Sequence, residues 1–385
     1  MSLIAAVVGE SFSLILLIMV CLLIVVLIMF VLVIIVYTTK INSFLILEAK
    51  MKSLMITKYG DVNSSLEEQE VPKPAVKANQ ILIKTYSSSF NPIDYKIVSG
   101  AYKALGKLSF PAGIGRDVSG IVDEVGKNVR KFKTGDKVYS RFNESFVGSM
   151  AEYVLSNVED TALMPSNLGF DESASIPLVG LTTYQALVDV AKLSKGESVL
   201  IHAGSGGIGT FAIQLAKHLG AKVTTTTSSK NVSFVKGLGA DKVIDYTSQN
   251  YLDEGAAFDV VYDTLGGDHT LNSFNVLKEG GRVLSIAGTI DSITAEQFGL
   301  NKFIRMILAF QARKVTRTAS KMNATYRFLY MSPNGEQLKK IAKLYESGKL
   351  KPILDKTYKF SESIQALEYL SKGHAKGKVV VKIRE

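Results

Sequence analysis

The stretch from residue 199 to residue 219 constrains the fold most strongly, because it joins three parts of one supersecondary unit. Val199–Ile201 is a short apolar run, long enough for one buried parallel strand. A glycine-rich turn follows, in which Gly204, Gly206 and Gly209 fit the pattern G-x-G-x-x-G. Apolar residues then recur at three- and four-residue spacing, as in a helix. This order of strand, turn and helix predicts a turn that binds the pyrophosphate of a dinucleotide.

Each of these glycines has a mechanical reason. Gly204 permits the sharp turn, Gly206 lets a pyrophosphate approach the backbone, and Gly209 lets the helix pack closely on the strand. The helix N-terminus offers free N–H groups and the positive end of its dipole to the phosphates. The alternative interpretation is an ordinary glycine-rich turn in a sheet protein.

The second strand of the unit bears on the choice of nucleotide. A site selective for NAD usually carries an acidic residue at the end of this strand, about 20 residues past the first glycine, to hold the ribose 2′-OH. Here Lys222–Thr227 leads into Ser228, Ser229 and Lys230, with no carboxylate. Hydroxyl groups and an ammonium suit a 2′-phosphate. We therefore expect NADPH as the cofactor, with a polar loop of no such role as the alternative.

The flanking sequence changes character along the chain. Residues 51–175 contain short apolar runs between Pro, Gly, Asn and Asp, which predicts a β-rich region, and Asn91–Asp94 is expected to be a turn. Residues 176–289 alternate between helical and strand patterns, which indicates a doubly wound parallel sheet. Near the end, Glu336–Ser347 is predicted as a helix and Lys378–Ile383 as a strand. The fold class is α/β.

The N-terminal run Phe12–Tyr37 carries no charged residue and exceeds the roughly 20 apolar residues that span a bilayer. Among charged residues only Glu10 precedes it, whereas Lys40 and further lysines follow. The positive-inside rule then predicts a single transmembrane helix with the catalytic body in the cytoplasm. The alternative is that translation starts at Met51, which leaves the body cytoplasmic and soluble.

Composition narrows the classes of function. The 385 residues suffice for two domains and an appendage, and 47% hydrophobic with 21% charged residues is a globular composition. The net charge of +10 favours contact with a phosphorylated cofactor, an anionic membrane or nucleic acid, or only solubility. The one cysteine, Cys21, excludes a disulfide framework and a cysteine-rich zinc site. The four histidines show no ligand spacing, so no metal site is expected.

A basic cluster follows the apolar segment Phe303–Phe310 and has two interpretations. It is either an amphipathic surface that touches an anionic membrane or a solvated helix face. Its members are Arg313, Lys314, Arg317, Lys321 and Arg327.

Several blocks, in order between Met51 and Ile383, carry a family resemblance. They are 91–96 (NPIDYK), 115–120 (GRDVSG), 148–153 (GSMAEY), 203–209 (AGSGGIG), 238–246 (LGADKVIDY), 263–266 (DTLG) and 374–381 (HAKGKVVV). Together they resemble the zinc-free medium-chain dehydrogenase/reductases of the quinone oxidoreductase, or zeta-crystallin-like, kind, in their alkenal/one oxidoreductase branch.

The resemblance implies a GroES-like β-rich catalytic domain around an inserted Rossmann domain. Residues 51–175 would begin the catalytic domain, residues 176–310 would bind NADP, and residues 311–385 would return to the catalytic domain. Residues 1–50 would be the anchor and linker. The resemblance also implies a homodimer.

The resemblance further implies roles for single residues. Asn91, Lys96 and Thr182 would lie near the nicotinamide, and Tyr102 would face the substrate. Relatives that reduce quinones often carry tyrosine where Lys96 stands, so a pure quinone specificity is in doubt. The cofactor-binding set would be Gly204, Gly206, Gly207, Ile208, Gly209, Ser228, Ser229, Lys230, Tyr246, Leu265 and Thr182.

The expected chemistry is hydride transfer from NADPH to a quinone or an α,β-unsaturated carbonyl, without zinc. Negative charge develops on the acceptor oxygen, and Lys96 and Tyr102 are the candidate groups to stabilise it, the proton coming from Tyr102 or water. The alternative is that neither residue takes part in catalysis, so that Tyr102 only lines the cleft and Lys96 is only a solvent-facing charge. Two other functions stay open, a 2-enoyl-thioester reductase and a zeta-crystallin-like NADPH- and RNA-binding protein. Nucleic acid is not the expected partner, because no aromatic-rich stacking motif is present.

Overall fold

The computed structural model describes residues 19–36, 49–103, 107–142, 148–297 and 299–384. The chain forms two compact units, residues 1–50 and residues 51–385. The first unit contains a helix at Met19–Val36 with a mean hydropathy of 3.8 and only exposed side chains. Length and composition make this helix a candidate membrane span, and a signal sequence meets the same criteria. The remainder of the predicted segment Phe12–Tyr37 lies outside the described residues.

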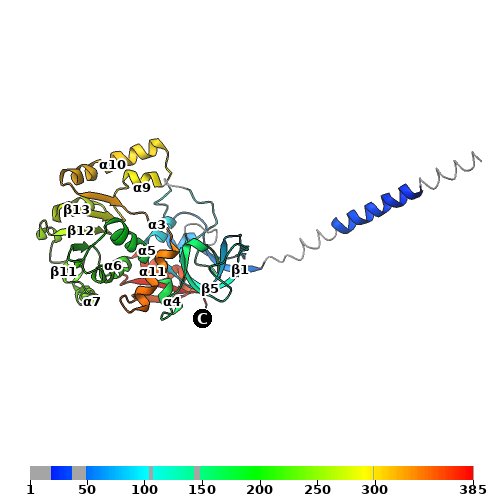
Figure 1. Cartoon of the computed structure of the whole chain (residues 1–385), viewed down its shortest axis with the longest axis horizontal. Helices are drawn as coiled ribbons and strands as arrows, with labels where there is room; N and C mark the ends of the chain where they lie inside the picture. The colour runs from blue at the N-terminus through cyan, green and yellow to red at the C-terminus, as the bar shows by residue number, and fades with distance from the viewer. Residues whose placement is uncertain (1–18, 37–48, 104–106, 143–147, 298, 385) are drawn as a thin grey trace, which may run out of the picture. The chain divides into compact units, whose positions relative to one another are not determined.

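A seven-stranded sheet forms the β-rich half of the second unit (Figure 1). Its C-terminal strand β16 pairs antiparallel with β3, so the end of the chain completes this half. In spatial order the strands are β15 (Leu354–Lys359), β16 (Lys378–Lys382), β3 (Gln80–Phe90), β5 (Asp117–Val125), β6 (Lys137–Arg141) and β8 (Thr161–Leu163), with β7 (Tyr153–Asn157) on β3. A smaller sheet consists of β2 (Leu66–Pro72), β1 (Lys50–Ile56) and β4 (Ala112–Gly113).

A six-stranded parallel sheet forms the other half, as the alternating pattern predicts. Val199, Leu200 and Ile201 are fully buried, as a strand covered on both faces requires. The edge strand of this sheet, at Thr325–Phe328, lies beyond residue 310, where the sequence analysis expected the NADP-binding domain to end. In spatial order the strands are β11 (Lys242–Asp245), β10 (Lys222–Thr227), β9 (Ser198–Ile201), β12 (Phe258–Asp263), β13 (Leu277–Ser285) and β14 (Thr325–Phe328).

α-Helices follow most strands of the six-stranded sheet (Figure 1), whereas no α-helix is found among the described residues between β5 and β8. The predicted helix Glu336–Ser347 is confirmed as α11, with Gly348 beyond its end at φ 70°. The α-helices are α2 (Val62–Ser65), α3 (Pro92–Val98), α4 (Phe170–Ala174), α5 (Pro177–Tyr184), α6 (Gly207–His218), α7 (Val232–Gly237), α8 (Asp268–Asn272), α9 (Ser292–Gln297), α10 (Lys302–Lys321), α11 (Gly335–Glu346) and α12 (Ser363–Ser371).

The predicted turn at Asn91–Asp94 is wrong, because α3 begins there. Asn91 is the N-cap, Pro92 is the first helical residue, and the backbone N–H of Asn91 donates to the carboxylate of Asp94 at 2.7 Å. Proline at the first helical position and an acid three residues after the cap favour a helix start as strongly as the same residues favour a turn. Because the segment is a helix and not a turn, the directions of the side chains after Asn91 follow from helix geometry.

Candidate active site

The glycine-rich turn has the tight geometry that its sequence requires. Gly204 donates its N–H to the carbonyl of Thr226 at 2.9 Å, and α6 begins at Gly207. A Cβ on Gly204 would overlap the side chain of Thr225, and one on Gly209 would overlap the carbonyl of Ala203. Both glycines are therefore needed for the close approach of helix, turn and sheet. The N-terminus of α6 leaves its first N–H groups without acceptors inside the helix.

This turn is attached to the β-rich half at the start of β16. Gly206 forms a β-bridge with Gly377, whose N–H donates to the carbonyl of Ser205 at 2.9 Å. A Cβ on Gly207 would come within 2.9 Å of the side chain of Lys378. The glycine-rich turn is thus held against one edge of the seven-stranded sheet.

A buried polar network lies at that edge, where β3 ends and β5 and β16 begin. The ammonium of Lys378 donates to Asn91 Oδ1 at 2.5 Å and to the carbonyl of Phe90 at 3.1 Å, and it lies 3.4 Å from Asp117 Oδ2. Lys378 is 5% exposed and Asp117 is fully buried. Burial lowers the pKa of Lys378, and the carboxylates of Asp117 and Asp94 oppose this shift.

Asp117 is the point where the two halves of the body meet. Its Oδ2 accepts hydrogen bonds from Ser89 at 3.0 Å and from Asn91 Nδ2 at 2.9 Å. Its Oδ1 accepts the N–H of Leu178, in the first turn of α5, at 2.9 Å. One carboxylate therefore ties two strands of the sheet to a helix that packs on α6. The sequence analysis missed Asp117 and Lys378 as site residues, because neither has a local spacing that signals its role.

The residues expected at the nicotinamide end occupy different environments. Asn91 is buried, and its amide is engaged by Lys378 and Asp117. Thr182 is also buried and donates its hydroxyl to the carbonyl of Leu178 at 2.6 Å. Hydrogen bonds thus hold both buried side chains in fixed orientations.

Lys96 and Tyr102 lie together at the end of α3. Lys96 is exposed, and its carbonyl accepts the N–H of Ala101 at 3.0 Å. Tyr102 is half-buried, and burial together with the neighbouring Tyr95 raises the pKa of its hydroxyl. The structure leaves an ammonium and a neutral phenol on one short segment.

The residues expected around the adenosine lie where β10 and β11 end side by side. The N–H of Tyr246 donates to the carbonyl of Thr227 at 3.0 Å, which brings Tyr246 next to the Ser228–Lys230 loop. Lys230 is exposed, as is Tyr246 at 63%. Asn231 donates to the hydroxyl of Ser205 at 3.2 Å, which links this loop to the glycine-rich turn.

Asp245 is a further residue at this end that the sequence analysis missed. Hydrogen bonds from Ser229 and Thr247 lower the pKa of its carboxyl, and Thr247 donates its hydroxyl to Asp245 Oδ1 at 2.8 Å. The acid stands at the end of β11, one strand away from the position where a ribose-binding acid is expected. Pairing of parallel strands, which sequence spacing does not show, brings it to the same edge.

Leu265 lies in the turn after β12, and a buried carboxylate fixes that turn. Asp263 Oδ1 accepts the N–H groups of Leu265 and Gly266 at 3.0 and 2.9 Å. Its Oδ2 accepts the hydroxyls of Thr270 and Ser285 at 2.6 and 2.8 Å. Leu265 is left 45% exposed at the same edge of the parallel sheet as the glycine-rich turn.

No metal centre is found among the residues described. Within 19–36, 49–103, 107–142, 148–297 and 299–384, no three His, Cys, Asp or Glu side chains form a group able to hold a metal ion. His202 is fully buried after β9, and burial lowers its pKa to about 4.

Comparisons with known proteins agree with this architecture. The family described as "Alcohol dehydrogenase GroES-like domain" matches residues 77–166, and the family described as "Zinc-binding dehydrogenase" matches residues 238–381. The chain is 36% identical to the 2-methylene-furan-3-one reductase of Solanum lycopersicum, over 87% of this chain and 80% of the relative. It is 34% identical to the chloroplastic NADPH-dependent alkenal/one oxidoreductase of Arabidopsis thaliana, over 86% and 79%. Among solved structures, the quinone oxidoreductase from Coxiella burnetii is similar, with 34% identity, a TM-score of 0.76, and coverage of 87% of this chain and 100% of that one.

Burial of Asp94 gives a testable dependence on pH. Desolvation raises its pKa from 3.8 to about 6, so the folded state holds the proton more tightly than the unfolded chain. The contribution of Asp94 to the free energy of unfolding is fully present below pH 4 and falls as the pH rises to about 6. In urea unfolding of the full chain in mild detergent, the free energy of unfolding of Asp94→Asn relative to wild type should rise by about 2 kcal/mol between pH 4 and pH 7. The exposed Asp253→Asn should show no such growth, and a constant difference for Asp94→Asn would contradict the assignment.

Proposed function

Because the chain belongs to the medium-chain dehydrogenase/reductase family, we propose that it transfers hydride from NADPH to a quinone or an α,β-unsaturated carbonyl, without zinc. The observation that carries the proposal is the attachment of the pyrophosphate turn to the Asn91–Lys378 edge. Helix α3 begins at this edge and leads into the segment of Lys96 and Tyr102, whose ammonium and phenol are the kind of groups that a developing oxyanion requires. The printed names of the relatives, an alkenal/one oxidoreductase and a quinone oxidoreductase, support the same substrate classes.

The glycine-rich turn fits the pyrophosphate of a dinucleotide. Gly206 lies at the N-cap of α6, where a Cβ would meet only the carbonyl of Ala203 at 3.4 Å, so the surface above it is open. The N–H groups of Gly207 and Ile208, in the first turn of this 12-residue helix, would hold the phosphates. Gly204 and Gly209 permit this arrangement by their close packing.

The choice of NADPH rests on charge at the end of β10. Lys230 is exposed and Ser228 and Ser229 supply hydroxyls, which together would bind a 2′-phosphate. Asp245 stands nearby, but the hydroxyls of Ser229 and Thr247 satisfy its carboxylate. The arrangement therefore favours NADPH, whose 2′-phosphate these groups would bind, over NADH, whose ribose 2′-OH would need a free carboxylate.

At the other end, the proposed roles follow from burial. When bound, NADPH supplies a hydride, and negative charge develops on the acceptor oxygen. Tyr102 stays protonated at neutral pH because burial raises the pKa of its hydroxyl, so it is able to give a proton to that oxygen. Lys96 stabilises the charge electrostatically. Asn91 acts as a positioning residue, since its side-chain amide bonds to Asp117 and Lys378 and its backbone occupies the N-cap position of α3.

Cofactor selectivity tests the adenosine end. Lys230→Ala should lower kcat/KM for NADPH by about 10- to 100-fold, because a charge-assisted contact is lost, and should leave kcat/KM for NADH nearly unchanged. The control is Lys236→Ala, which removes an exposed lysine from the neighbouring helix α7. Wild-type protein that uses NADH as well as NADPH would overturn the assignment.

The substrate class and the proton donor are tested together. NADPH oxidation is followed with a quinone, an enone and a crotonyl thioester. Wild type should turn over the quinone or the enone, and Tyr102→Phe should lower kcat for the enone by about 100-fold with the KM for NADPH unchanged. Tyr95→Phe, which alters the neighbouring phenol, should retain the wild-type rate. Turnover of the thioester alone would select the 2-enoyl-thioester reductase instead.

We also propose that the helix Met19–Val36 anchors the protein in a membrane, with the catalytic body in the cytoplasm. Its length, its composition and the lysines that follow it support this. After ultracentrifugation of native cell extract, the full-length protein should stay in the membrane fraction and resist an alkaline carbonate wash. Recovery in the soluble fraction, or a native N-terminus at Met51, would show that no anchor exists.

A further inference from the structure

The solvent face of α10 has a composition that the fold does not explain. Its inner face is fixed by Ala312, Val315 and Ala319, which are at most 5% exposed; Val315 and Ala319 belong to a core cluster beneath the helix. The opposite face changes character along the 20-residue helix, from apolar in its first half to basic in its second. The buried residues all lie in the second half of α10, so core packing does not account for the large apolar side chains of the first half.

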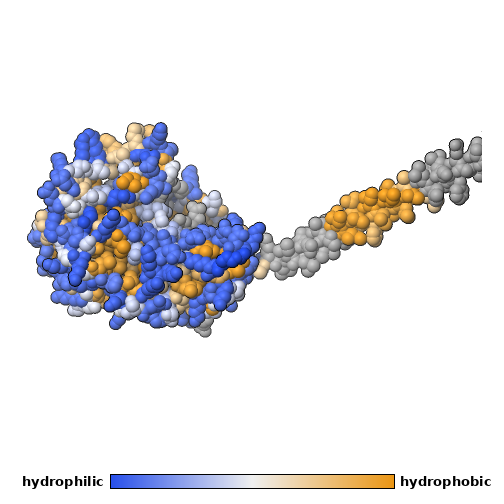
Figure 2. Space-filling view, viewed as in Figure 1, coloured by the Kyte–Doolittle hydropathy of each residue, from blue (hydrophilic) through white to orange (hydrophobic). Residues whose placement is uncertain are grey.

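The first half presents a stripe of large apolar side chains, which we call the α10 apolar stripe. Phe303 is 66% exposed, Met306 61%, Ile307 42% and Phe310 72%. Their spacing of three and four residues puts them on one face of the helix. In Figure 2 pale and deep orange atoms lie beside blue ones near the position of α10 in Figure 1. A contiguous exposed stripe of this kind usually marks an interaction surface.

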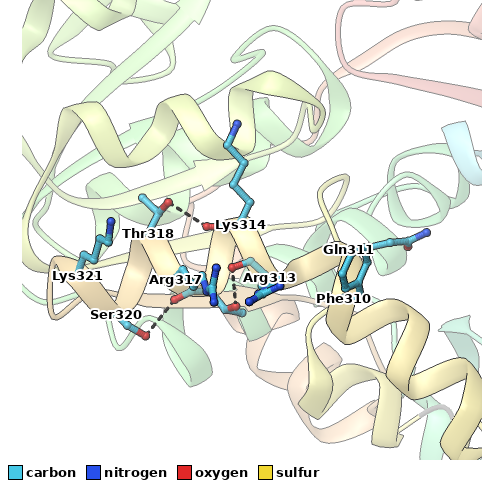
Figure 3. A pocket seen from close by; sticks show the side chains of 9 residues that line it. Phe310, Gln311, Arg313, Lys314, Arg317, Thr318, Ser320 and Lys321 are labelled. Carbon is cyan, nitrogen blue, oxygen red and sulfur yellow. Dashed lines mark hydrogen bonds between the residues drawn. The ribbon is translucent and has the colours of Figure 1, made fainter.

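The second half presents exposed cations, which line a groove of about 760 Å³ together with Phe310 (Figure 3). Thr316, Thr318 and Ser320 donate their hydroxyls to carbonyls of the same helix, and these neutral groups add no negative charge to the surface. The helix contains no acidic residue. Its cations are Lys302, Arg305, Arg313, Lys314, Arg317 and Lys321.

Arg327, which the sequence grouped with these cations, does not belong to the surface. It lies in β14, and its Nε donates to Asp291 at 3.1 Å. Arg305 is paired with Glu296 at 3.5 Å. The unit that remains is the apolar stripe followed by Arg313, Lys314, Arg317 and Lys321.

We propose that this face of α10 docks on the surface of an anionic lipid bilayer. The α10 apolar stripe would enter the boundary between headgroups and acyl chains, and the basic half would contact the phosphates and carboxylates of the headgroups. The combination of bulky apolar side chains with uncompensated positive charge matches the two components of such a surface, and this docking does not require the N-terminal anchor.

A second copy of the chain fits this face poorly. A closed dimer through this face would pair α10 antiparallel with its own copy, so the basic half of one helix would lie on the apolar stripe of the other. This pairing would desolvate the cations without giving them an opposite charge, whereas an anionic bilayer supplies that charge.

The absence of tryptophan from the chain allows a specific reporter. Phe310→Trp places the only tryptophan on the α10 apolar stripe, and Leu163→Trp places it on β8, at a site with 56% exposure. The full-length variants are reconstituted in vesicles with roughly 30% phosphatidylserine, or in neutral phosphatidylcholine vesicles, each with and without brominated lipids. The emission of Phe310→Trp should shift to the blue and fall by about half with brominated anionic lipids, while that of Leu163→Trp should not change.

Charge variants test the basic half. In the Phe310→Trp background, replacing Arg313, Lys314 and Arg317 by glutamine should abolish the quenching in anionic vesicles. The matched control replaces Lys339, Lys340 and Lys343, which are exposed lysines on α11 and give the same change in net charge; it should keep the quenching. Every variant should retain NADPH oxidation, so a failure of docking is distinct from a failure of the proposed function.

Three outcomes would overturn the proposal. The first is that brominated lipids quench Phe310→Trp equally weakly in anionic and in neutral vesicles. Another is equal quenching of Leu163→Trp, which would indicate unspecific adsorption. The third is a blue shift in detergent without lipid that rises with protein concentration, which would make a second copy the occupant.

Discussion

The ammonium of Lys378 holds together the parts on which the proposed function depends. It lies buried between Asn91, the carbonyl of Phe90 and Asp117, and its stem passes beneath Gly207. A buried ion pair adds little net stability, but loss of either partner leaves an uncompensated charge, so the pair fixes one arrangement of the chain. That arrangement places the pyrophosphate turn, the cap of α3 and the start of β5 at one edge.

Two carboxylates are occupied by neighbouring groups, one at each end of the proposed cofactor site. Asp117 is buried and accepts hydrogen bonds from Ser89, Asn91 and Leu178, so it fixes the edge at which we propose that the nicotinamide binds without being exposed there. Asp245 lies at the adenosine end and is engaged by hydroxyls of Ser229 and Thr247. In both cases hydrogen bonds to neighbours occupy the acid, which leaves Lys96 and Lys230 as the exposed charges of the two ends.

The positive charge of the chain gathers in at least two places for which we propose different roles. Lys230 is part of the proposed recognition of a 2′-phosphate, whereas the cations of α10 continue an apolar stripe on the solvent face of the body. Sequence spacing identified the basic cluster but not which of its members share a surface. Arg327 leaves the cluster because β14 carries it to Asp291, a contact decided by the packing of strand against loop.

The sequence by itself determined the turn at Gly204–Gly209, the parallel strands on either side of it and the absence of an acid after Thr227. These features depend on residues close together in the chain, so the physics of glycine, helix termini and apolar periodicity reveals them. Only the tertiary structure decided that Asn91 lies at the N-cap of a helix with its amide bonded to Lys378 and Asp117. It also decided that Lys378 and Asp117 join the β-rich half to the half with the parallel sheet. It also placed Asp245 beside Ser229 and the side chains of Phe303–Phe310 in solvent. These contacts join residues that lie far apart in sequence or on opposite faces of one element, and packing of the whole chain fixes them.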